Sequence, residues 1–293
     1  MHRSIAFLST DDLEDYFVWD DLLIEPFAQN GIKVDVISWH AKQINWSQYD
    51  AVIVRSTWDY QLHAEAFVAK LAEITEQDTV LINPLSLIQW NISKRYLQTL
   101  ASKGITIIPS VFFDSVAISD IYAQFDHFDT QEIIIKPLIS ANSDNTFRLD
   151  HASLMGQAGP LSNIFSTTPC VIQPFLNSVI SEGEYSLFYF NGEYSHTIKK
   201  VPKSGDFRVQ EEHGGELISV TPDELQLETA AKVLAALPEK SLYARVDLLR
   251  NSNAEAGDIW QLMEVELIEP SLYFNMDEAS PERFVQATIS YLS

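Results

Sequence analysis

The stretch WQLMEVELIEP, residues 260–270, decides how this chain folds near its C-terminal end. Glu264 and Glu266 are two positions apart, so a β-strand directs both carboxylates to one face and the intervening apolar side chains to the other. An upstream stretch, YARVDLL at residues 243–249, alternates in the same way and carries Asp247. If the two strands pair across the polar loop between them, the three carboxylates converge.

Three converging carboxylates raise one another's pKa or hold a cation between them. A magnesium ion, bound by oxygen ligands and shared with phosphate groups, would resolve this repulsion. The predicted metal ligands are therefore Asp247, Glu264 and Glu266. A solvated acidic face is the alternative, because the whole chain is acidic.

The composition restricts the partners that this protein can have. The chain has 293 residues, 46% of them hydrophobic, and 19 basic against 41 acidic residues give a net charge of −22. Such a charge repels nucleic acid and anionic membranes, so neither is an expected partner. Cys170 is the single cysteine, which excludes an intrachain disulfide and fits a reducing cytoplasm. The acidic start is unlike a signal peptide, and no apolar run is long enough for a membrane helix, so we expect a cytoplasmic protein.

The first third of the chain alternates strand and helix patterns. Strands are predicted at 4–8, 33–38, 49–55 and 80–83, and helices at 19–30 and 64–75. Short apolar strands that alternate with helices favour a parallel sheet covered on both faces. Ligands of such sheets bind beyond the carboxyl ends of the strands. The stretch RSTWDY therefore makes Arg55, Trp58 and Asp59 candidate substrate residues.

The remaining two-thirds is expected to be α+β with antiparallel hairpins. Helices are predicted at 92–103 and 225–237, and strands at 106–111, 132–136, 169–175, 185–190, 194–201, 242–249 and 259–268. The change in pattern places domain boundaries near residues 90 and 175. The three predicted units are 1–90, 91–175 and 176–293.

Basic residues gather in KKVPKSGDFRVQEEHGG, residues 199–215. Arginine and lysine beside flexible glycines suit phosphate binding, although an ordinary basic hairpin tip would look the same. Lys136 ends the apolar strand EIIIKP, where a lysine is costly unless an anion meets it or its amine reaches solvent. The chain has neither GxxxxGK[ST] nor GxGxxG, which argues against P-loop, Rossmann dinucleotide and protein-kinase sites.

In this order the motifs resemble the ATP-grasp superfamily, especially its glutathione synthetase and ribosomal-protein glutamate ligase branch. GDFRVQEEHGG is similar to the phosphate segment of the glutamate ligases, and Asp247 with EVE to the metal ligands of the family. RSTWDY, QPFL and LIEPS resemble a subgroup that includes the cycloserine-pathway ligase. The resemblance implies a Rossmann-like N-terminal α/β domain followed by α+β ATP-grasp lobes with antiparallel sheets.

The resemblance also assigns roles to individual residues. The implied nucleotide site consists of Lys94, Lys136, Gln173, Pro174, Phe175, Glu184, Lys199, Arg208 and Gln210. Within it, Arg208 and Lys136 would be catalytic, residues 173–175 would grip adenine, and Glu184 would lie near the ribose. Arg245 and Ser271 join the substrate candidates. One departure is the flap at residues 139–149, which reads ISANSDNTFRL and lacks the glycines usual in the family.

The implied reaction is an ATP- and magnesium-dependent ligation, with manganese as an alternative ion. A carboxylate would be activated as an acyl phosphate and joined to an amine, releasing ADP and phosphate, with both substrates small molecules. An ATP-grasp phosphotransferase and a non-catalytic nucleotide-binding regulatory protein are the alternatives. Relatives are often oligomeric, which leaves a homodimer as one expectation.

Overall fold

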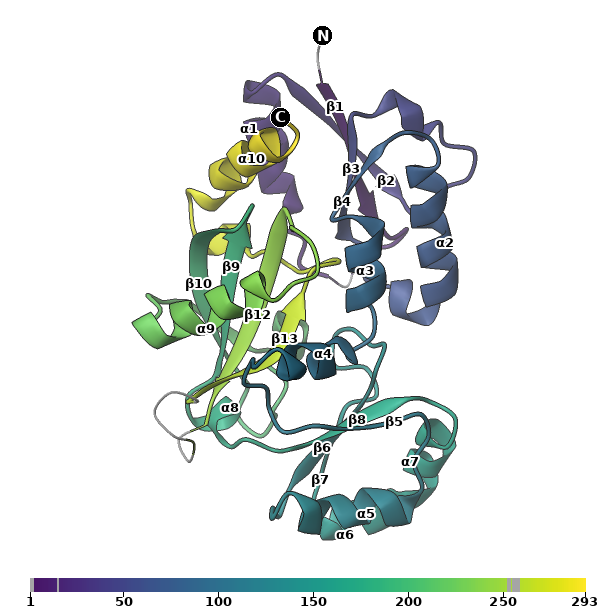
Figure 1. The fold of residues 1–293 in the computed structure, drawn as a ribbon, viewed down its shortest axis with the longest axis vertical. Helices are drawn as coiled ribbons and strands as arrows, with labels where there is room; N and C mark the ends of the chain where they lie inside the picture. The colour runs from purple at the N-terminus through teal and green to yellow at the C-terminus, as the bar shows by residue number, and fades with distance from the viewer. Residues whose placement is uncertain (1–2, 15, 252–253, 255–258) are drawn as a thin grey trace.

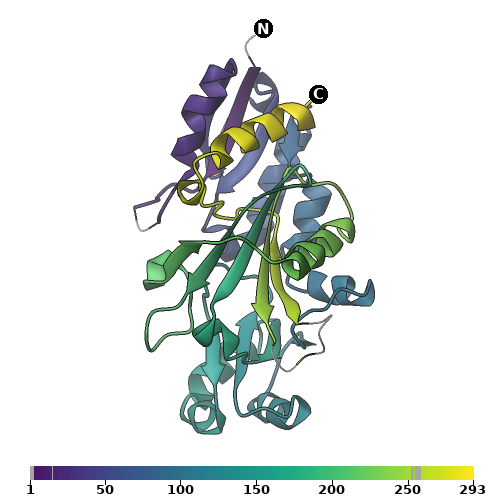
Figure 2. The same ribbon diagram turned by 90° about the vertical axis from the view of Figure 1, so that its left-hand side faces the viewer.

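The fold is described from a computed structural model that covers the chain except residues 1–2, 15, 252–253 and 255–258. Three sheets follow one another along the long axis of the molecule (Figure 1, Figure 2). Most of the polar loop predicted between the last two strands, 250–258, lies outside the described residues. None of the helices in the described part combines the length and apolar character that a membrane crossing needs.

The first sheet is four-stranded and parallel, as the alternating pattern predicted. Its strand order is β2 (Ile32–Ser38), β1 (Arg3–Ser9), β3 (Ala51–Ser56) and β4 (Val80–Ile82). Its helices are η1 (Asp20–Leu23), α1 (Ile24–Gln29), η2 (Trp46–Gln48), η3 (Tyr60–Leu62), α2 (Ala64–Thr75) and α3 (Leu85–Asn91). Alternate residues of β1 enter two different cores: Phe7 packs with α1, and Leu8 packs in the core that contains α2. Both faces of the sheet are therefore covered.

The second sheet is antiparallel and lies at the far end of the molecule from the first (Figure 1). Its strands in order are β5 (Val111–Phe113), β8 (Cys170–Pro174), β6 (Ile133–Pro137) and β7 (Phe147–Leu149). Its helices are α5 (Ile118–His127), α6 (His151–Gly156) and α7 (Ala158–Phe165), and α4 (Tyr96–Ser102) precedes it.

The third sheet lies between the other two (Figure 2) and is five-stranded. Its order is β11 (Glu216–Ser219), β10 (Glu193–Val201), β9 (Glu184–Phe190), β12 (Tyr243–Arg250) and β13 (Trp260–Glu266), all antiparallel. Its helices are α8 (Ser178–Ser181), η4 (Glu211–His213), α9 (Glu224–Ala235), η6 (Phe274–Met276) and α10 (Ser280–Tyr291). The predicted fold class, a parallel α/β domain followed by α+β lobes with antiparallel sheets, is confirmed.

Three predicted elements differ from the structure. The helix predicted at 19–30 is a 3₁₀ turn followed by the short α1. The helix predicted at 92–103 begins only at Tyr96, because the backbone N–H of Lys94 donates to the carbonyl of Leu138 at 2.8 Å. The strand predicted at 106–111 is interrupted at Pro109, which has no N–H to donate. Residue Ile107 forms an isolated bridge with Leu262, and β5 starts at Val111.

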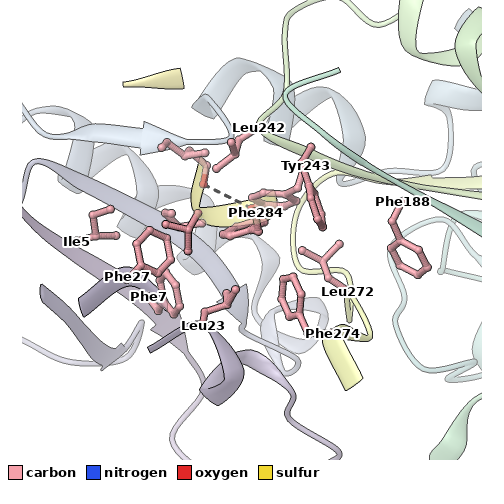
Figure 3. Close-up of a cluster of buried hydrophobic side chains, with 14 of the residues drawn as sticks. Ile5, Phe7, Leu23, Phe27, Phe188, Leu242, Tyr243, Leu272, Phe274 and Phe284 are labelled. Atoms are coloured by element: carbon pink, nitrogen blue, oxygen red, sulfur yellow. Dashed lines mark hydrogen bonds between the residues drawn. The ribbon is translucent and has the colours of Figure 1, made fainter. Parts of the chain in front are cut away.

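Helix α10 connects the two ends of the chain. Its residue Phe284 packs on Phe27 of α1 with ring centroids 6.3 Å apart, inside a core that also holds Ile5 and Tyr243 (Figure 3). Aromatic contacts of this kind add to the stabilisation from buried area. Residues 280–291 thus pack on η1 and α1 of the first domain as well as on β9 and β10 of the third sheet. The units 1–90, 91–175 and 176–293 stay a prediction.

Candidate active site

A cavity of about 230 Å³ lies where the three sheets meet. The first sheet contributes Trp58 and Tyr60, which follow β3, and the second contributes Lys136 and Gln173. Strands β9, β10, β12 and β13 of the third sheet line the same space. The cavity therefore brings together side chains as far apart in the sequence as Tyr16 and Tyr273.

One part of the cavity is apolar. Ile108, Phe175, Val209 and Leu249 form a small core, with Ile134 and Met263 packed against it, and all six line the cavity. Gln173, next to this core, donates from Nε2 to the hydroxyl of Ser110 at 2.9 Å. Apolar walls with a few fixed polar groups are typical of sites for flat heterocycles. Residues Gln173, Pro174 and Phe175, predicted to grip adenine, all line this part.

The other part of the cavity is rich in cations. Lys94, Lys136, Lys200, Arg208 and Arg245 line it, in a chain of net charge −22. Lys94 contacts Glu264 at 3.1 Å and donates to the carbonyl of Ser140 at 3.0 Å. Arg208 donates to the carboxylate of Asp206 at 2.7 Å. These five side chains are the groups that could contact a phosphate, and four of them are already paired with carboxylates.

Lys136 differs from the other cations of the cavity. Only 9% of the surface of Lys136 is exposed. Within the described part of the chain, its amine forms no ion pair with a carboxylate. Burial lowers the pKa of Lys136, and the charge of Lys94 adds to this, while Glu264 opposes it. A buried ammonium without an ion-pair partner is the group that gains most from an arriving anion.

The two strands that carry the predicted acidic residues pair with one another. Strands β12 and β13 pair so that Asp247 faces Glu264 and Arg245 faces Glu266. Arg245 donates to Asp247 at 2.9 Å and also contacts Glu266. Lys200 pairs with Glu184 and lies 3.8 Å from Asp247. The result is a buried network of alternating charge at the end of the cavity.

Burial and neighbouring charges set the pKa values in this network. Burial would raise the pKa of Asp247, but Arg245 and Lys200 outweigh it and lower the pKa below its ordinary value. Burial raises the pKa of Glu266 to about 7, with Asp247 and Glu264 adding to the effect and Arg245 opposing it. Of the two glutamates of β13 that line the cavity, Glu266 is therefore the one whose negative charge most needs a further cation.

The predicted metal ligands are not assembled as a three-carboxylate cluster. Across the described ranges, no three Asp, Glu, His or Cys side chains are grouped so as to hold a metal ion. The reason is that each acid already has a cation: Asp247 is 1% exposed between Arg245 and Lys200, and Glu264 contacts Lys94. Glu264 and Glu266 both line the cavity and offer the hard oxygen donors that magnesium prefers. The residues thus fit magnesium at these two positions, and Asp247 would have to exchange its present partners to join them.

Some predicted site residues lie elsewhere. Lys199 does not line the cavity, whereas its neighbour Lys200 does, because Lys200 pairs with Glu184 of β9 on the cavity side of the sheet. Arg55 is buried, with Asp20 at 2.7 Å and the carbonyl of Pro270 at 3.1 Å as partners. Asp59 accepts from Trp39 Nε1 at 2.7 Å, outside the cavity lining.

Asp247 does not line the cavity either, whereas the other predicted residues do: Lys94, Lys136, Gln173, Pro174, Phe175, Glu184, Arg208, Gln210, Glu264, Glu266, Trp58, Arg245 and Ser271. Sequence analysis missed Lys200 and Glu269. A signal existed for each: Lys200 belongs to the same basic segment, and Glu269 is the third acid of EVELIE. Lys200 could not be chosen without the pairing of the strands, and Glu269 could not be chosen without the contacts that Trp58 and Arg55 make with its segment.

The glycine-poor flap lies against the cavity. Asn142 and Ser143 line it, and Gln210 donates from Nε2 to the hydroxyl of Ser143 at 2.9 Å. Asn142, Ser143 and Asn145 have φ angles of 47°, 60° and 49°, in the left-handed region that asparagine enters more readily than most residues. The flap therefore reaches glycine-like backbone conformations without glycine.

Comparisons with known proteins agree with this geometry. The model of the prokaryotic glutathione synthetase ATP-grasp domain matches residues 106–256, which is more than half of the chain. The chain belongs to the ATP-grasp family. It is an ATP-dependent enzyme of the carboxylate–amine ligase class.

Its relatives place it more closely within the family. The model of the N-terminal domain of D-cycloserine synthetase DcsG matches residues 5–83. The cycloserine biosynthesis protein DcsG of Streptomyces lavendulae is 30% identical over 288 residues, covering 90% of this chain and 91% of that protein. The crystal structure of D-cycloserine synthetase DcsG superposes with a TM-score of 0.87 at 27% identity, and the match covers 99% of this chain and 100% of the other. The D-alanine–D-alanine ligase of Bacillus anthracis shares the fold, with a TM-score of 0.70, 13% identity, and coverage of 99% and 97% of the two chains.

Proposed function

We propose that this ligase binds ATP across the cavity, with adenine on the apolar part and the phosphates among the cations. The support is the split of one cavity into an apolar half around Phe175 and a cationic half around Lys136. Lys94, Lys136 and Arg208 are the proposed phosphate contacts, and Gln210 and Glu184 remain in the proposed nucleotide site. We move the role first given to Lys199 to Lys200, which lines the cavity.

ATP-grasp ligases use ATP and magnesium. In this chain Glu264 and Glu266, with Asp247 behind them, are the residues proposed to hold the ion; manganese remains an untested alternative. When bound, the ion would offset the negative charge of the phosphates during transfer. Arg208 and Arg245, both guanidinium groups that line the cavity, are proposed to stabilise the charged oxygens of the transferred phosphoryl group and of the tetrahedral intermediate.

The substrates are proposed to be a small carboxylate and an amine, and amino acids contain both groups. The names of two relatives, D-cycloserine synthetase and D-alanine–D-alanine ligase, refer to D-alanine and to a cyclic derivative of a D-amino acid, so small D-amino acids are the first compounds to test. Trp58 and Ser271 line the cavity and keep their proposed substrate roles, while Arg55 is proposed to position the segment that follows β13. Asp59 stays an untested candidate. The charge of −22 continues to argue against nucleic acid as a partner, and the cytoplasm and a homodimer remain predictions.

The test is a panel of D- and L-amino acids with purified protein, magnesium and ATP, followed by release of ADP. Hydroxylamine is added in parallel because it converts an acyl phosphate into a hydroxamate. We expect ADP release with at least one amino acid, formation of an amide, and a hydroxamate in the trapped sample. A phosphoester product would support a phosphotransferase, and ATP binding without turnover of any compound would support a regulatory protein.

Glu264→Gln tests the proposed metal position, and Glu216→Gln on the exposed edge strand β11 is its matched control. We expect Glu264→Gln to lose at least about 100-fold in ADP release, as is typical when a charge-stabilising group of a transition state is removed, and the control to keep its activity. Equal activity of the two variants would remove Glu264 from the metal site.

A further inference from the structure

Glu269 lies at the edge of the cavity next to the first domain. The segment that carries it is fixed by residues outside the third sheet: Trp58 donates from Nε1 to the carbonyl of Glu269 at 2.9 Å, and Arg55 donates to the carbonyl of Pro270 at 3.1 Å. Tyr243 donates to the carbonyl of Ile268 at 2.8 Å. Three hydrogen bonds on three consecutive carbonyls hold this segment in one position, so the side chain of Glu269 is pre-organised.

Glu269 differs from the other buried and half-buried acids around the cavity; Glu212, which also lines the cavity, is exposed. Asp247, Glu184, Glu264 and Glu266 each have a lysine or arginine nitrogen within 4 Å. Glu269 is 9% exposed, and no lysine or arginine in the described part of the chain forms an ion pair with it. A buried carboxylate without a cation is costly, so the site is complementary to a positive charge that the protein itself does not supply.

The surroundings of Glu269 favour an organic cation. The hydroxyl of Tyr60 interacts with its carboxyl group, and Trp58 donates to its backbone carbonyl. Tyr16 packs on Trp58 with ring centroids 5.1 Å apart, and all three aromatic residues line the cavity. Faces of tyrosine and tryptophan attract ammonium groups at the same time as they exclude water.

The charges around Glu269 also favour the binding of a cation. Burial raises the pKa of Glu269 to about 8; Glu266 and Glu264 add to the effect, and Lys94 and the Tyr60 hydroxyl oppose it. A carboxyl group in this position is largely neutral at pH 7 until a cation arrives. Binding of an ammonium ion would then favour its charged form.

We propose that Glu269, beside the rings of Tyr60 and Trp58, binds the ammonium group of an amino-acid substrate. This inference rests on the proposed ligase function and assigns to the cavity an ammonium subsite next to the proposed phosphate and magnesium positions. The subsite selects an amino acid over the same molecule without its amino group. The Glu269 carboxylate accepts hydrogen bonds from the ammonium group, and the aromatic rings cover its remaining side.

The test compares pairs of compounds that differ only in the ammonium group: D-serine with 3-hydroxypropionate, and D-alanine with propionate. Binding is measured by calorimetry with magnesium and a non-hydrolysable ATP analogue present, and ADP release is measured with ATP. The proteins are wild type, Glu269→Gln, Glu269→Asp, and the exposed control Glu216→Gln. A thermal melt of each variant checks folding.

We expect wild type and control to bind at least one amino acid about 10- to 100-fold more tightly than its deaminated partner, as a charge-assisted hydrogen bond provides. Glu269→Gln should remove this difference while leaving the affinity for the ATP analogue unchanged, and Glu269→Asp should restore part of it. Equal binding of both members of each pair by wild type, binding of neither, or an unchanged difference in Glu269→Gln would overturn the proposal. Equal ADP release with an amino acid and with its deaminated partner would refute the ammonium subsite alone. No ADP release with any carboxylate would refute the proposed ligase roles as well.

Discussion

Replacing Lys136 with methionine should change stability and nucleotide binding in opposite directions. Lys136 is a lysine buried at the cavity, and burial lowers its pKa, which shows that its charge is held at a cost in the free protein. The sign follows from linkage: a base whose pKa is lowered on folding destabilises the folded state at every pH below its unfolded pKa, so this cost is present at pH 7. Methionine keeps much of the aliphatic stem and removes the charge.

The magnitude for binding follows from the contact that is lost. One charge-assisted contact to a phosphate contributes about 1.5–3 kcal/mol, or roughly 10- to 100-fold in affinity. Lys136→Met should therefore bind ATP 10- to 100-fold more weakly, although the free variant melts at the same temperature as wild type or higher. Lys240→Met, at an exposed position, is the control that should change neither quantity.

The assay is calorimetric titration with magnesium and a non-hydrolysable ATP analogue, together with a thermal melt of the free protein. An unchanged affinity for the analogue would refute the assignment of Lys136 to the phosphates. A variant that lost affinity only because it was partly unfolded would show a lower melting temperature, and the reasoning about the buried charge would then be wrong.

Three further predictions follow from other parts of the structure. His196 is buried, its Nε2 donates to the carbonyl of Leu272 at 3.1 Å, and burial lowers its pKa from 6.5 to about 4. As the pH falls, the histidine of the unfolded chain is therefore protonated before that of the folded protein. The free energy of unfolding in urea should decrease by about 2 kcal/mol between pH 7 and pH 5. His196→Gln should lose this part of the pH dependence, and an equal dependence in both proteins would contradict the assignment. Arg55→Met leaves the Asp20 carboxylate buried without its partner, which should lower the free energy of unfolding in urea by about 3 kcal/mol. A loss below about 1 kcal/mol would show that this buried ion pair contributes little to the stability of the protein. Lys199→Met should leave kcat/KM for ATP within about twofold because the side chain lies outside the cavity lining, and a large drop in that constant would return Lys199 to the nucleotide site.

The periodic parts of the fold could be predicted from the sequence. Helix α2 has the predicted bounds. The alternation around Glu264 and Glu266 predicted that both carboxylates lie on one face of the strand, and both residues line the cavity. The type of an element and the face on which its side chains lie depend on the local spacing of apolar residues, which can be seen directly in the sequence.

Features that depend on pairing between distant strands could not be predicted. The choice between Lys199 and Lys200 depends on which one pairs with Glu184, and a bulge between Tyr194 and His196 shifts that register. The partners of Asp247 were missed for the same reason, since its contact with Lys200 crosses from β12 to β10. Helix α10 was missed because its packing on α1 joins the two ends of the chain.

The measurement that tests this account most directly is a crystal structure with magnesium and a non-hydrolysable ATP analogue. We predict phosphates on Lys94, Lys136 and Arg208, a magnesium ion on Glu264 and Glu266, and Lys94 released from the contact with Glu264 that it makes in the free protein. Phosphates bound away from these three cations, or an ion that touches neither glutamate, would contradict it.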